Sequence, residues 1–336
     1  MATTNKLLIL EDGAQITGLL MPQAQSRGYE LVTYRDATGV LVMARQLQAD
    51  AMLLDSQLRG AGSVIALKAF RRNVNTAALP VVAVLGRTGP KAEDLKAAGA
   101  QAVVSEPYDA RKLFDAVDSN LQAELDFTAG PAQALAEPAQ VEATEAANVI
   151  DTPPEPAFDR LTKLSAQLLM APVTLATFVT RTRQFFKSAM GLAEPWATER
   201  GTPLTHSFCQ WVVSSKEPLV VDDAREHAVL KSNLAIRDLG VIAYAGVPMT
   251  GKGGLAIGSF CAIDTKPRKW TEDDLKTLHD LAVIAETYSH PDPARHRNAV
   301  EAASRILRRY GPRLRDAERE QLLDIIEEQT LRLVPR

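Results

Sequence analysis

Five short apolar runs, separated by stretches with helical periodicity, occupy the first 125 residues and limit the folds that this chain can adopt. An apolar run of about 4 to 8 residues is typical of a buried strand, whereas apolar residues at every third or fourth position indicate a helix. Strands that alternate with helices predict a doubly wound, mainly parallel α/β sheet. The expected strands are 6–10, 29–34, 50–55, 80–85 and 101–105, and helices are expected over 37–48 and 109–121.

Carboxylates stand at the carboxyl ends of these strands, which is where a doubly wound sheet binds its ligands. Glu11 and Asp12 follow the first expected strand, and Asp55 closes the third. Carboxylate oxygens suit Mg²⁺, and one of the carboxylates can accept a phosphoryl group while the metal screens the charge. The sequence therefore predicts an acidic site on this edge of the sheet.

The order and spacing of Glu11, Asp12 and Asp55 resemble the response-regulator receiver domain, and the resemblance covers most of residues 1–125. It implies that these three residues hold Mg²⁺ and that Asp55 is the phosphoacceptor. It also implies a Ser or Thr at the end of the fourth strand and a Lys before a cis-proline at the end of the fifth.

Two of those positions depart from the family's pattern, because Leu85 stands at the hydroxyl position and Glu106 at the Lys position. The loop after Asp55 has Arg59 in place of the usual proline. A further carboxylate beside the acidic cluster repels a phosphoryl dianion, which favours a pseudo-receiver that serves as a docking domain. The alternative is a working phosphoacceptor whose four acids bind a divalent ion more tightly, with Thr88 as a surrogate hydroxyl.

Residues 129–147, within the segment 126–147, are built almost wholly from Ala, Pro, Glu, Gln and Thr, which have little capacity to anchor a core. We interpret them as a linker that is partly helical near its end. A second break, rich in proline, follows at 289–295. The expected organisation is a receiver-like domain at 1–125, the linker at 126–147, a middle domain at 148–288 and a helical tail at 289–336.

The middle domain begins and ends with helical patterns and has strand-like runs between them. Thr271 is the expected N-cap of the closing helix, because three acidic residues follow it in the favourable first turn. This arrangement predicts an α+β domain with one antiparallel sheet covered by helices.

Phrases such as "RQFFKSAMGL", "THSFCQWVV" and "GSFCAIDTKPRKWTEDDL" are similar to the GAF domains of bacterial sensor proteins. The resemblance implies a sensor but leaves its ligand unknown. Cys209 and Cys261 are not obvious attachment points for a bilin, and His206 with Cys209 gives too few ligands for a structural Zn²⁺ site. A candidate ligand pocket, with ordinary core as the alternative interpretation, consists of Phe186, Phe208, Cys209, Trp211, Tyr244 and Phe260.

The tail reads as two amphipathic helices that meet near residue 311. It loosely resembles the dimerisation region of sensor histidine kinases, although the phosphoacceptor His motif is missing and no ATP-binding segment follows. A lone hairpin leaves part of its apolar stripe in water, so we expect two hairpins to pair into a four-helix bundle in a homodimer. The residues expected to be partly exposed are Ile306, Leu307, Leu322, Ile325 and Ile326.

Charge and cysteine content narrow the cellular setting. The net charge is -3, from 38 basic and 41 acidic residues, which favours neither nucleic acid nor an anionic membrane. A cluster of arginines in the tail is followed at once by acidic residues, so the tail does not read as a nucleic-acid anchor. The two cysteines lie far apart in the sequence, which indicates a reducing cytoplasm.

These features predict a non-enzymatic regulatory adaptor of a two-component or phosphorelay pathway, with a (pseudo-)receiver, a GAF sensor and protein partners from that pathway. The alternative is the input and dimerisation half of a sensor histidine kinase or phosphotransfer protein. The terminal "LVPR" resembles the remnant of a cleavable tag, which is consistent with a chain that is part of a longer protein.

Overall fold

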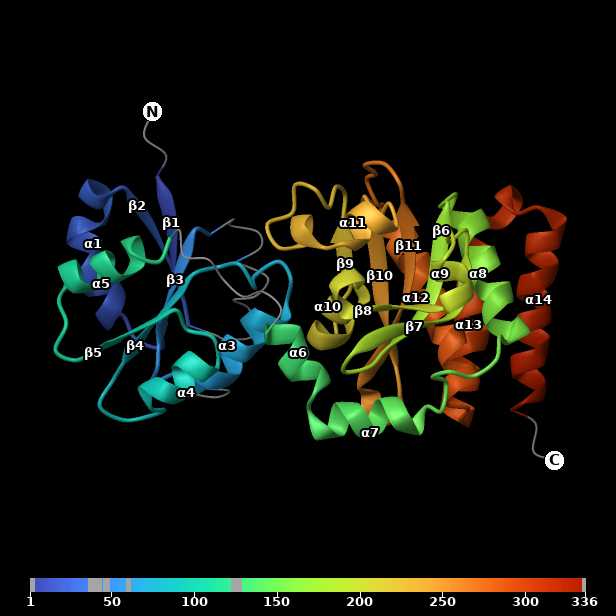
Figure 1. Ribbon diagram of the computed structural model, residues 1–336, viewed down its shortest axis with the longest axis horizontal. Helices are drawn as coiled ribbons and strands as arrows, with labels where there is room; N and C mark the ends of the chain where they lie inside the picture. The colour runs from blue at the N-terminus through green and yellow to red at the C-terminus, as the bar shows by residue number, and fades with distance from the viewer. Residues whose placement is uncertain (1–3, 36–43, 45–48, 59–61, 122–128, 334–336) are drawn as a thin grey trace. The chain divides into compact units, whose positions relative to one another are not determined.

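The computed structural model describes residues 4–35, 44, 49–58, 62–121 and 129–333 and divides the chain into two compact units, Met1–Pro131 and Ala132–Arg336 (Figure 1). Each unit has its own sheet and its own core. The helix expected over 37–48 and the position of Arg59 lie outside the described residues.

The first unit contains the predicted five-stranded sheet, which is parallel throughout and has the strand order β2-β1-β3-β4-β5. This is the flavodoxin-like order of a doubly wound sheet, so the predicted fold class is confirmed. The strands are β1 (Asn5–Leu10), β2 (Tyr29–Tyr34), β3 (Ala51–Asp55), β4 (Val81–Leu85) and β5 (Ala102–Ser105).

Helices cover both faces of this sheet because successive side chains of each strand point to opposite sides. Leu7 and Ile9 of β1 pack with α1 and α5, whereas Leu8 and Leu10 pack with α3 and α4. Burial on both faces explains why the strands read as unbroken apolar runs. The helices are α1 (Gln15–Ala24), α3 (Gly62–Arg72), α4 (Ala92–Ala97) and α5 (Ala110–Asp118).

The second unit contains a six-stranded antiparallel sheet with the order β8-β7-β6-β11-β10-β9, as predicted for an α+β domain. Helices α8 (Pro156–Leu169) and α12 (Glu272–Ser289) share a core with one face, and α10 (Cys209–Ser215) packs against β10 and β11. The strands are β6 (Val173–Val179), β7 (Arg183–Met190), β8 (Gly201–Pro203), β9 (Leu219–Val221), β10 (Ala243–Thr250) and β11 (Ala256–Asp264).

Helix α12 begins where the sequence predicted. The hydroxyl of Thr271 accepts a hydrogen bond from the backbone N–H of Asp274 at 3.1 Å, and the Asp274 carboxylate accepts one from the Thr271 N–H at 2.9 Å. This reciprocal capping satisfies two backbone donors that the first turn leaves unpaired.

The Ala-rich segment expected to be a linker forms two helices, α6 (Ala129–Leu135) and α7 (Pro138–Ala146). The Gln140 side-chain amide of α7 donates to the Ala256 carbonyl of β11 at 2.6 Å, and Ala143 and Ala147 belong to the core that contains Phe158. Alanine has the highest helix propensity, and its small side chain lets a helix approach a sheet closely. The same composition that suggested a free linker therefore builds a docked helix.

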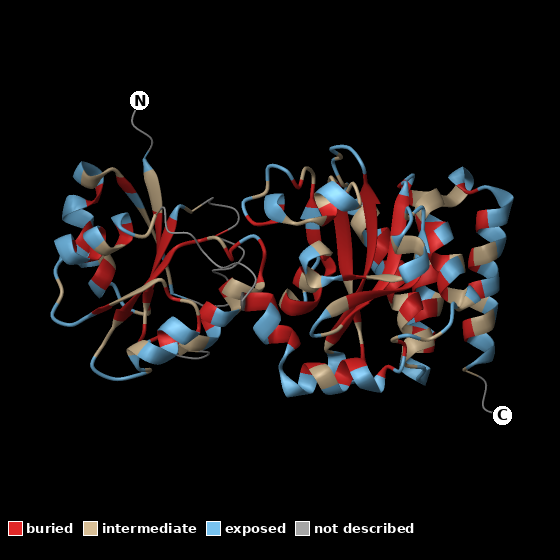
Figure 2. Cartoon of the chain, viewed as in Figure 1, coloured by how far each residue is buried: buried red, intermediate tan, exposed pale blue. Residues whose placement is uncertain are grey.

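The tail forms the predicted hairpin, α13 (Pro293–Tyr310) and α14 (Asp316–Leu331), but most of its apolar stripe is buried. Ile306, Leu322 and Ile325 are fully buried in the core shared with α8 and α12, and Leu307 and Ile326 pack against its edge. Figure 2 shows buried and exposed positions alternating along the tail helices. The expectation that this stripe stays partly exposed is therefore wrong for Ile306, Leu322 and Ile325, whereas Leu307 and Ile326 are partly exposed. The reason is that α12 carries a second apolar face, which covers the hairpin within the same chain.

A buried carboxylate fixes this packing. Asp280 of α12 forms salt bridges with Arg305 at 2.8 Å and Arg309 at 2.9 Å, both from α13. Two guanidinium groups offset the cost of burying the charge. Among the helices within the described residues, we find none with the apolar length that a bilayer crossing requires.

Candidate functional site

The predicted acidic site begins with Glu11, directly after β1. Its side chain is 1% exposed, and its carboxylate accepts hydrogen bonds from the backbone N–H groups of Ile16 and Thr17, each at 2.9 Å. The Thr17 hydroxyl donates to it as well. Glu11 thus caps the first turn of α1, where backbone donors and the helix dipole favour a negative charge.

Asp55 closes β3 and is half-buried on the same edge of the sheet. One of its carboxylate oxygens accepts a hydrogen bond from the Gln57 N–H at 2.8 Å. Burial raises the pKa of Asp55, the Gln57 hydrogen bond partly opposes that rise, and the charges of Glu11 and Asp12 add to it. The structure therefore brings the three predicted carboxylates close enough for their charges to interact.

Glu106 lies directly after β5, and its carboxylate forms a salt bridge with the guanidinium of Arg87 at 2.9 Å. Arg87 belongs to the loop after β4, two residues beyond Leu85, which is the last residue of that strand. The peptide bond between Glu106 and Pro107 is cis. Sequence reasoning identified the carboxylate at this position but missed the cation that pairs with it.

Two further contacts organise this edge. The Thr88 hydroxyl, predicted as a surrogate for the missing one, accepts a hydrogen bond from the Gln57 side chain at 2.8 Å. Lys112 of α5 donates its ammonium group to the carbonyls of Ser105 at 3.2 Å and Pro107 at 3.1 Å. Thr88 therefore joins the loops after β3 and β4, and Lys112 fastens the turn that holds Glu106.

The residues at this edge do not fit the Mg²⁺ site that the family resemblance implies. Both oxygens of Glu11 are engaged by the start of α1, and Asp55 uses one oxygen on the backbone. Within the part of the chain that the structure describes, no three His, Cys, Asp or Glu side chains are grouped so that they could hold a metal ion.

The aromatic residues predicted as a GAF pocket fall on both faces of the second sheet. Tyr244 faces α10: its ring lies 5.4 Å from that of Phe208, and its hydroxyl donates to the Cys209 sulfur at 3.4 Å. Phe260 belongs to the opposite core, with Phe158 and α12. Phe186 lies on a third strand, β7, where it pairs with Thr177 of β6. All six predicted residues are buried, namely Phe186, Phe208, Cys209, Trp211, Tyr244 and Phe260.

The two cysteines meet in this part of the core. The Cys209 and Cys261 sulfurs are 4.0 Å apart, and Tyr244 also hydrogen-bonds Ser259 at 3.1 Å. The hydrogen bond between the thiols lowers the pKa of Cys209 against the effect of burial, whereas burial raises the pKa of Cys261. Both thiols are free and fully enclosed.

His206 does not pair with Cys209, which the sequence had left open. Its ring nitrogen Nε2 lies 3.0 Å from the carboxylate of Asp238 in α11 (Ala235–Asp238), and its other nitrogen contacts the Thr205 hydroxyl at 3.0 Å. Hydrogen bonds from Arg237 and His206 lower the pKa of Asp238 to about 2. The His206–Asp238 pair joins the segment before α10 to the loop between β9 and β10, which is a structural role.

Comparison with known proteins matches residues 153–287 to the GAF domain family. This segment is a GAF domain. A cyclic di-GMP phosphodiesterase of Pseudomonas aeruginosa is 27% identical to the chain over 135 residues, which are 40% of this chain and 22% of that protein. The chain thus spans about a fifth of the length of this curated relative.

Solved structures of response regulators resemble about a third of the chain. A putative response regulator from Chloroflexus aurantiacus is 22% identical, covers 36% of this chain and 100% of its own, and gives a TM-score of 0.34. The receiver domain of a sensor histidine kinase from Pseudomonas aeruginosa, with magnesium in its active-site cleft, is 19% identical, covers 36% and 100%, and gives 0.33. The GAF match covers the second sheet, and the first unit has the doubly wound strand order β2-β1-β3-β4-β5.

Proposed function

We propose that the chain is a non-enzymatic regulatory adaptor of a two-component or phosphorelay pathway in the cytoplasm. In this proposal the first unit is a pseudo-receiver that docks protein partners, and the GAF domain receives the signal. The observation that carries it is the salt bridge between Arg87 and Glu106, at the position where the resembling family has a lysine. The guanidinium of Arg87 is committed to this carboxylate instead of a phosphoryl group.

The rest of the acidic edge supports the same proposal. Glu11 caps α1, Leu85 offers no hydroxyl, and Thr88 holds Gln57. A phosphoryl group on Asp55 would add about two negative charges close to the carboxylates of Glu11 and Asp12, whose charges already raise the pKa of Asp55. A docking surface does not require phosphorylation of Asp55. A pseudo-receiver with these substitutions can therefore still bind protein partners.

The tail bears on the alternative function, the input and dimerisation half of a sensor histidine kinase. Dimerisation through the tail requires an exposed apolar face on the hairpin. Ile306, Leu322 and Ile325 are instead covered by α12 of the same chain. We therefore leave tail-mediated homodimerisation out of the proposal. A homodimer through another surface is compatible with it.

Intact-mass spectrometry after incubation with acetyl phosphate and Mg²⁺ tests the pseudo-receiver. Acetyl phosphate would transfer its phosphoryl group to the Asp55 carboxylate and release acetate. We expect the mass of the chain to stay unchanged, because Leu85 and Glu106 stand where the resembling family has a hydroxyl and a cation for the phosphoryl oxygens. Stoichiometric addition that disappears in Asp55→Asn would refute the proposal and restore the working phosphoacceptor.

A further inference from the structure

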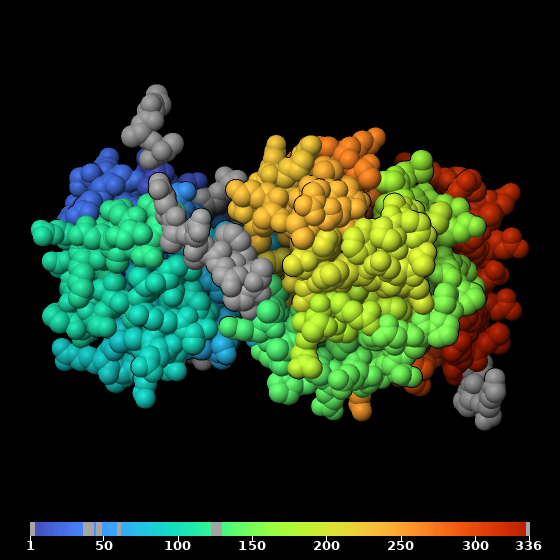
Figure 3. Space-filling view, viewed as in Figure 1, coloured from blue at the N-terminus to red at the C-terminus, as the bar shows by residue number. Residues whose placement is uncertain are grey.

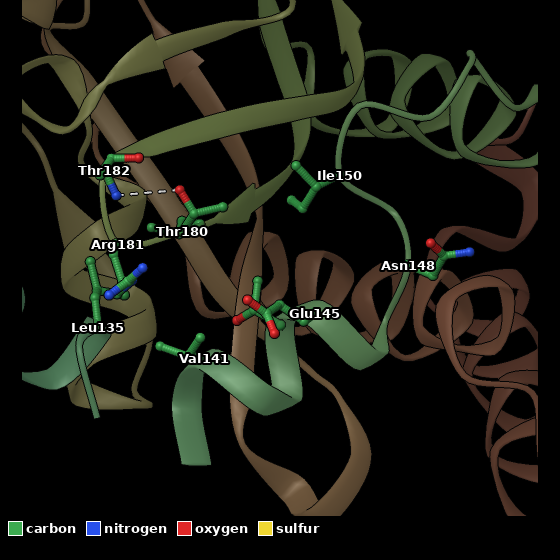
Figure 4. Close-up of a pocket in the computed structure, with 10 residues that line it drawn as sticks. Leu135, Val141, Glu145, Asn148, Ile150, Thr180, Arg181 and Thr182 are labelled. Carbon is green, nitrogen blue, oxygen red and sulfur yellow. Dashed lines mark hydrogen bonds between the residues drawn. The ribbon is translucent and has the colours of Figure 1, made fainter. Parts of the chain in front are cut away.

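A hollow of about 390 Å³ lies within the second unit, between α7, the β6–β7 turn and the segment after α7 (Figure 4). None of its lining residues belongs to the set predicted from the aromatic pattern. Small-molecule sites in proteins begin at about 300 Å³, so the hollow can hold a compact ligand. It is lined by Leu135, Val141, Thr144, Glu145, Asn148, Ile150, Val179, Thr180, Arg181 and Thr182.

The deep part of the hollow is aliphatic. Leu135 is 2% exposed and Val179 is 1% exposed, and Val141 and Ile150 are half-buried beside them. None of the described residues that line it is aromatic, so they offer no platform for stacking a nucleobase or a flavin. Contact with this lining stabilises a small aliphatic group by removing it from water.

The rim carries two opposite charges. Arg181 extends from the β6–β7 turn, and Glu145 extends from α7 into the same hollow (Figure 4). Both are exposed, and neither has an ion-pair partner among the residues that the structure describes. The neighbouring guanidinium of Arg183, in contrast, is paired with Asp151 at 2.5 Å. A ligand therefore meets one available cation and one available anion.

The walls are held in place without a ligand. Gln140 fastens α7 to the Ala256 carbonyl of β11 at 2.6 Å. In the turn, the Thr180 hydroxyl donates to the Arg183 carbonyl at 2.9 Å and accepts from the Thr182 N–H at 3.3 Å. A site that is already formed loses little conformational entropy when a ligand binds.

The far wall is the strap, which we define as residues 148–155 and which is fastened to β7. Lys187 is 0% exposed, and its ammonium group lies 2.5 Å from the Glu155 carboxylate and 3.0 Å from the Pro153 carbonyl. Arg200 donates to the Thr152 carbonyl at 2.9 Å. The strap therefore cannot collapse into the hollow without breaking contacts of buried charge.

We propose that this hollow binds a small zwitterion with an aliphatic body, such as an amino acid. Its carboxylate binds the guanidinium of Arg181, its ammonium group binds the carboxylate of Glu145, and its carbon chain packs on Val141, Ile150 and Val179. Either charge alone is better solvated in water, so recognition requires both together. The ligand contacts α7 and the strap, which precede α8 of the GAF domain in the chain. The proposal does not depend on the role of Asp55.

Isothermal titration of the full chain with four probes tests it. Leucine has adjacent charges, ε-aminocaproate has charges at opposite ends, and isocaproate and isoamylamine each carry only one. We expect one of the two zwitterions to bind at least about tenfold more tightly than both single-charge probes, as one lost charge-assisted hydrogen bond predicts. Absence of binding at millimolar zwitterion, or equal binding of a single-charge probe, overturns the proposal.

Variants identify the site. Arg181→Gln and Glu145→Gln should each weaken the better zwitterion by at least about tenfold, whereas Glu142→Gln, an exposed position on α7 outside the lining, should leave it unchanged. Val141→Phe should fill the hollow and abolish binding, with circular dichroism to check the fold. Binding that is indifferent to both charge variants would place the ligand elsewhere and refute this site.

Discussion

The guanidinium of Arg87 lies 2.9 Å from the carboxylate of Glu106, so the two loops that follow β4 and β5 are joined by a salt bridge. Arg87 is otherwise exposed, which keeps the energetic contribution of the pair small. Its main effect is on charge, because the negative group at the end of β5 is neutralised from the neighbouring loop. Figure 3 shows the surface of this unit in the blue and teal that mark its residue numbers.

Reversing this arrangement should make the first unit more receptive to a phosphoryl group. In Leu85→Thr/Glu106→Lys, a hydroxyl and a cation return to the two edge positions that face Asp55 in the resembling family. We expect a phosphoryl adduct to appear with acetyl phosphate and Mg²⁺, measured by intact mass. Arg87→Ala is the control, because it frees Glu106 without adding a cation and should give no adduct. If the double variant stays unmodified, the capping role of Glu11 is the remaining obstacle.

The tail helices should behave as part of the GAF domain core. Ile306→Ala removes a side chain that is 0% exposed, and we expect it to lower the free energy of unfolding by about 2 to 5 kcal/mol. Leu323→Ala, on the other tail helix but 51% exposed, should change it by less than about 0.5 kcal/mol. Urea unfolding followed by circular dichroism measures both. Equal effects would mean that the hairpin does not pack on α12 in solution.

The loop between β9 and β10 should loosen as the pH falls. The His227 ring accepts hydrogen bonds from the Val229 and Leu230 N–H groups at 3.2 and 3.3 Å, which only a neutral imidazole nitrogen can do. Burial lowers the pKa of His227 from 6.5 to about 4. Between those values the unfolded chain binds a proton that the folded chain does not, so stability is retained above pH 6.5 and lost toward pH 4.

Denaturant unfolding at a series of pH values checks this effect. The loss attributable to His227 should be on the order of 1 to 3 kcal/mol by pH 4. His227→Gln keeps a hydrogen-bond acceptor but cannot titrate, so its stability should vary less between pH 6.5 and 4. A parallel pH dependence in the variant and the original chain would assign the effect to other groups.

The two thiols should resist modification in the folded protein. Cys209 and Cys261 are buried, with Tyr244 and Ser259 packed around them. A bulky disulfide reagent should therefore label neither thiol until the domain opens, although their sulfurs are 4.0 Å apart. Labelling in urea should yield both. Rapid labelling of Cys209 without denaturant would indicate that α10 detaches readily from the sheet.

Much of the fold follows from the sequence, because strand and helix periods are local. The five strands of the first sheet were predicted for this reason. The capping Thr271 was predicted from the acidic residues that directly follow it, which is also a local signal. The face of the second sheet on which each aromatic side chain lies could not be predicted from the sequence. Phe260 and Tyr244 lie on adjacent strands, but Phe260 pairs with Val247 and Tyr244 with Ile263, and this register places the two rings on opposite faces.

The partners of charged groups could not be predicted from the sequence either. Arg87 and Glu106 are 19 residues apart and meet only because β4 and β5 are neighbours in the sheet. The tail showed an apolar stripe, yet its period could not reveal that α12 supplies the covering surface. The hollow beside α7 gave no signal either, because it forms where an alanine-rich helix crosses the β6–β7 turn.

The strap has a mechanical consequence. Arg183, Lys187 and Arg200 hold its residues at successive points along β7 and at the start of β8, each by a charged group. A force applied to the chain at Asn148 would act along β7 and would load these contacts at the same time, as in shear. The contacts would not break one after another, as they do in peeling. Tension arriving from the preceding helices would therefore reach the sheet of the GAF domain before it could unwind α8.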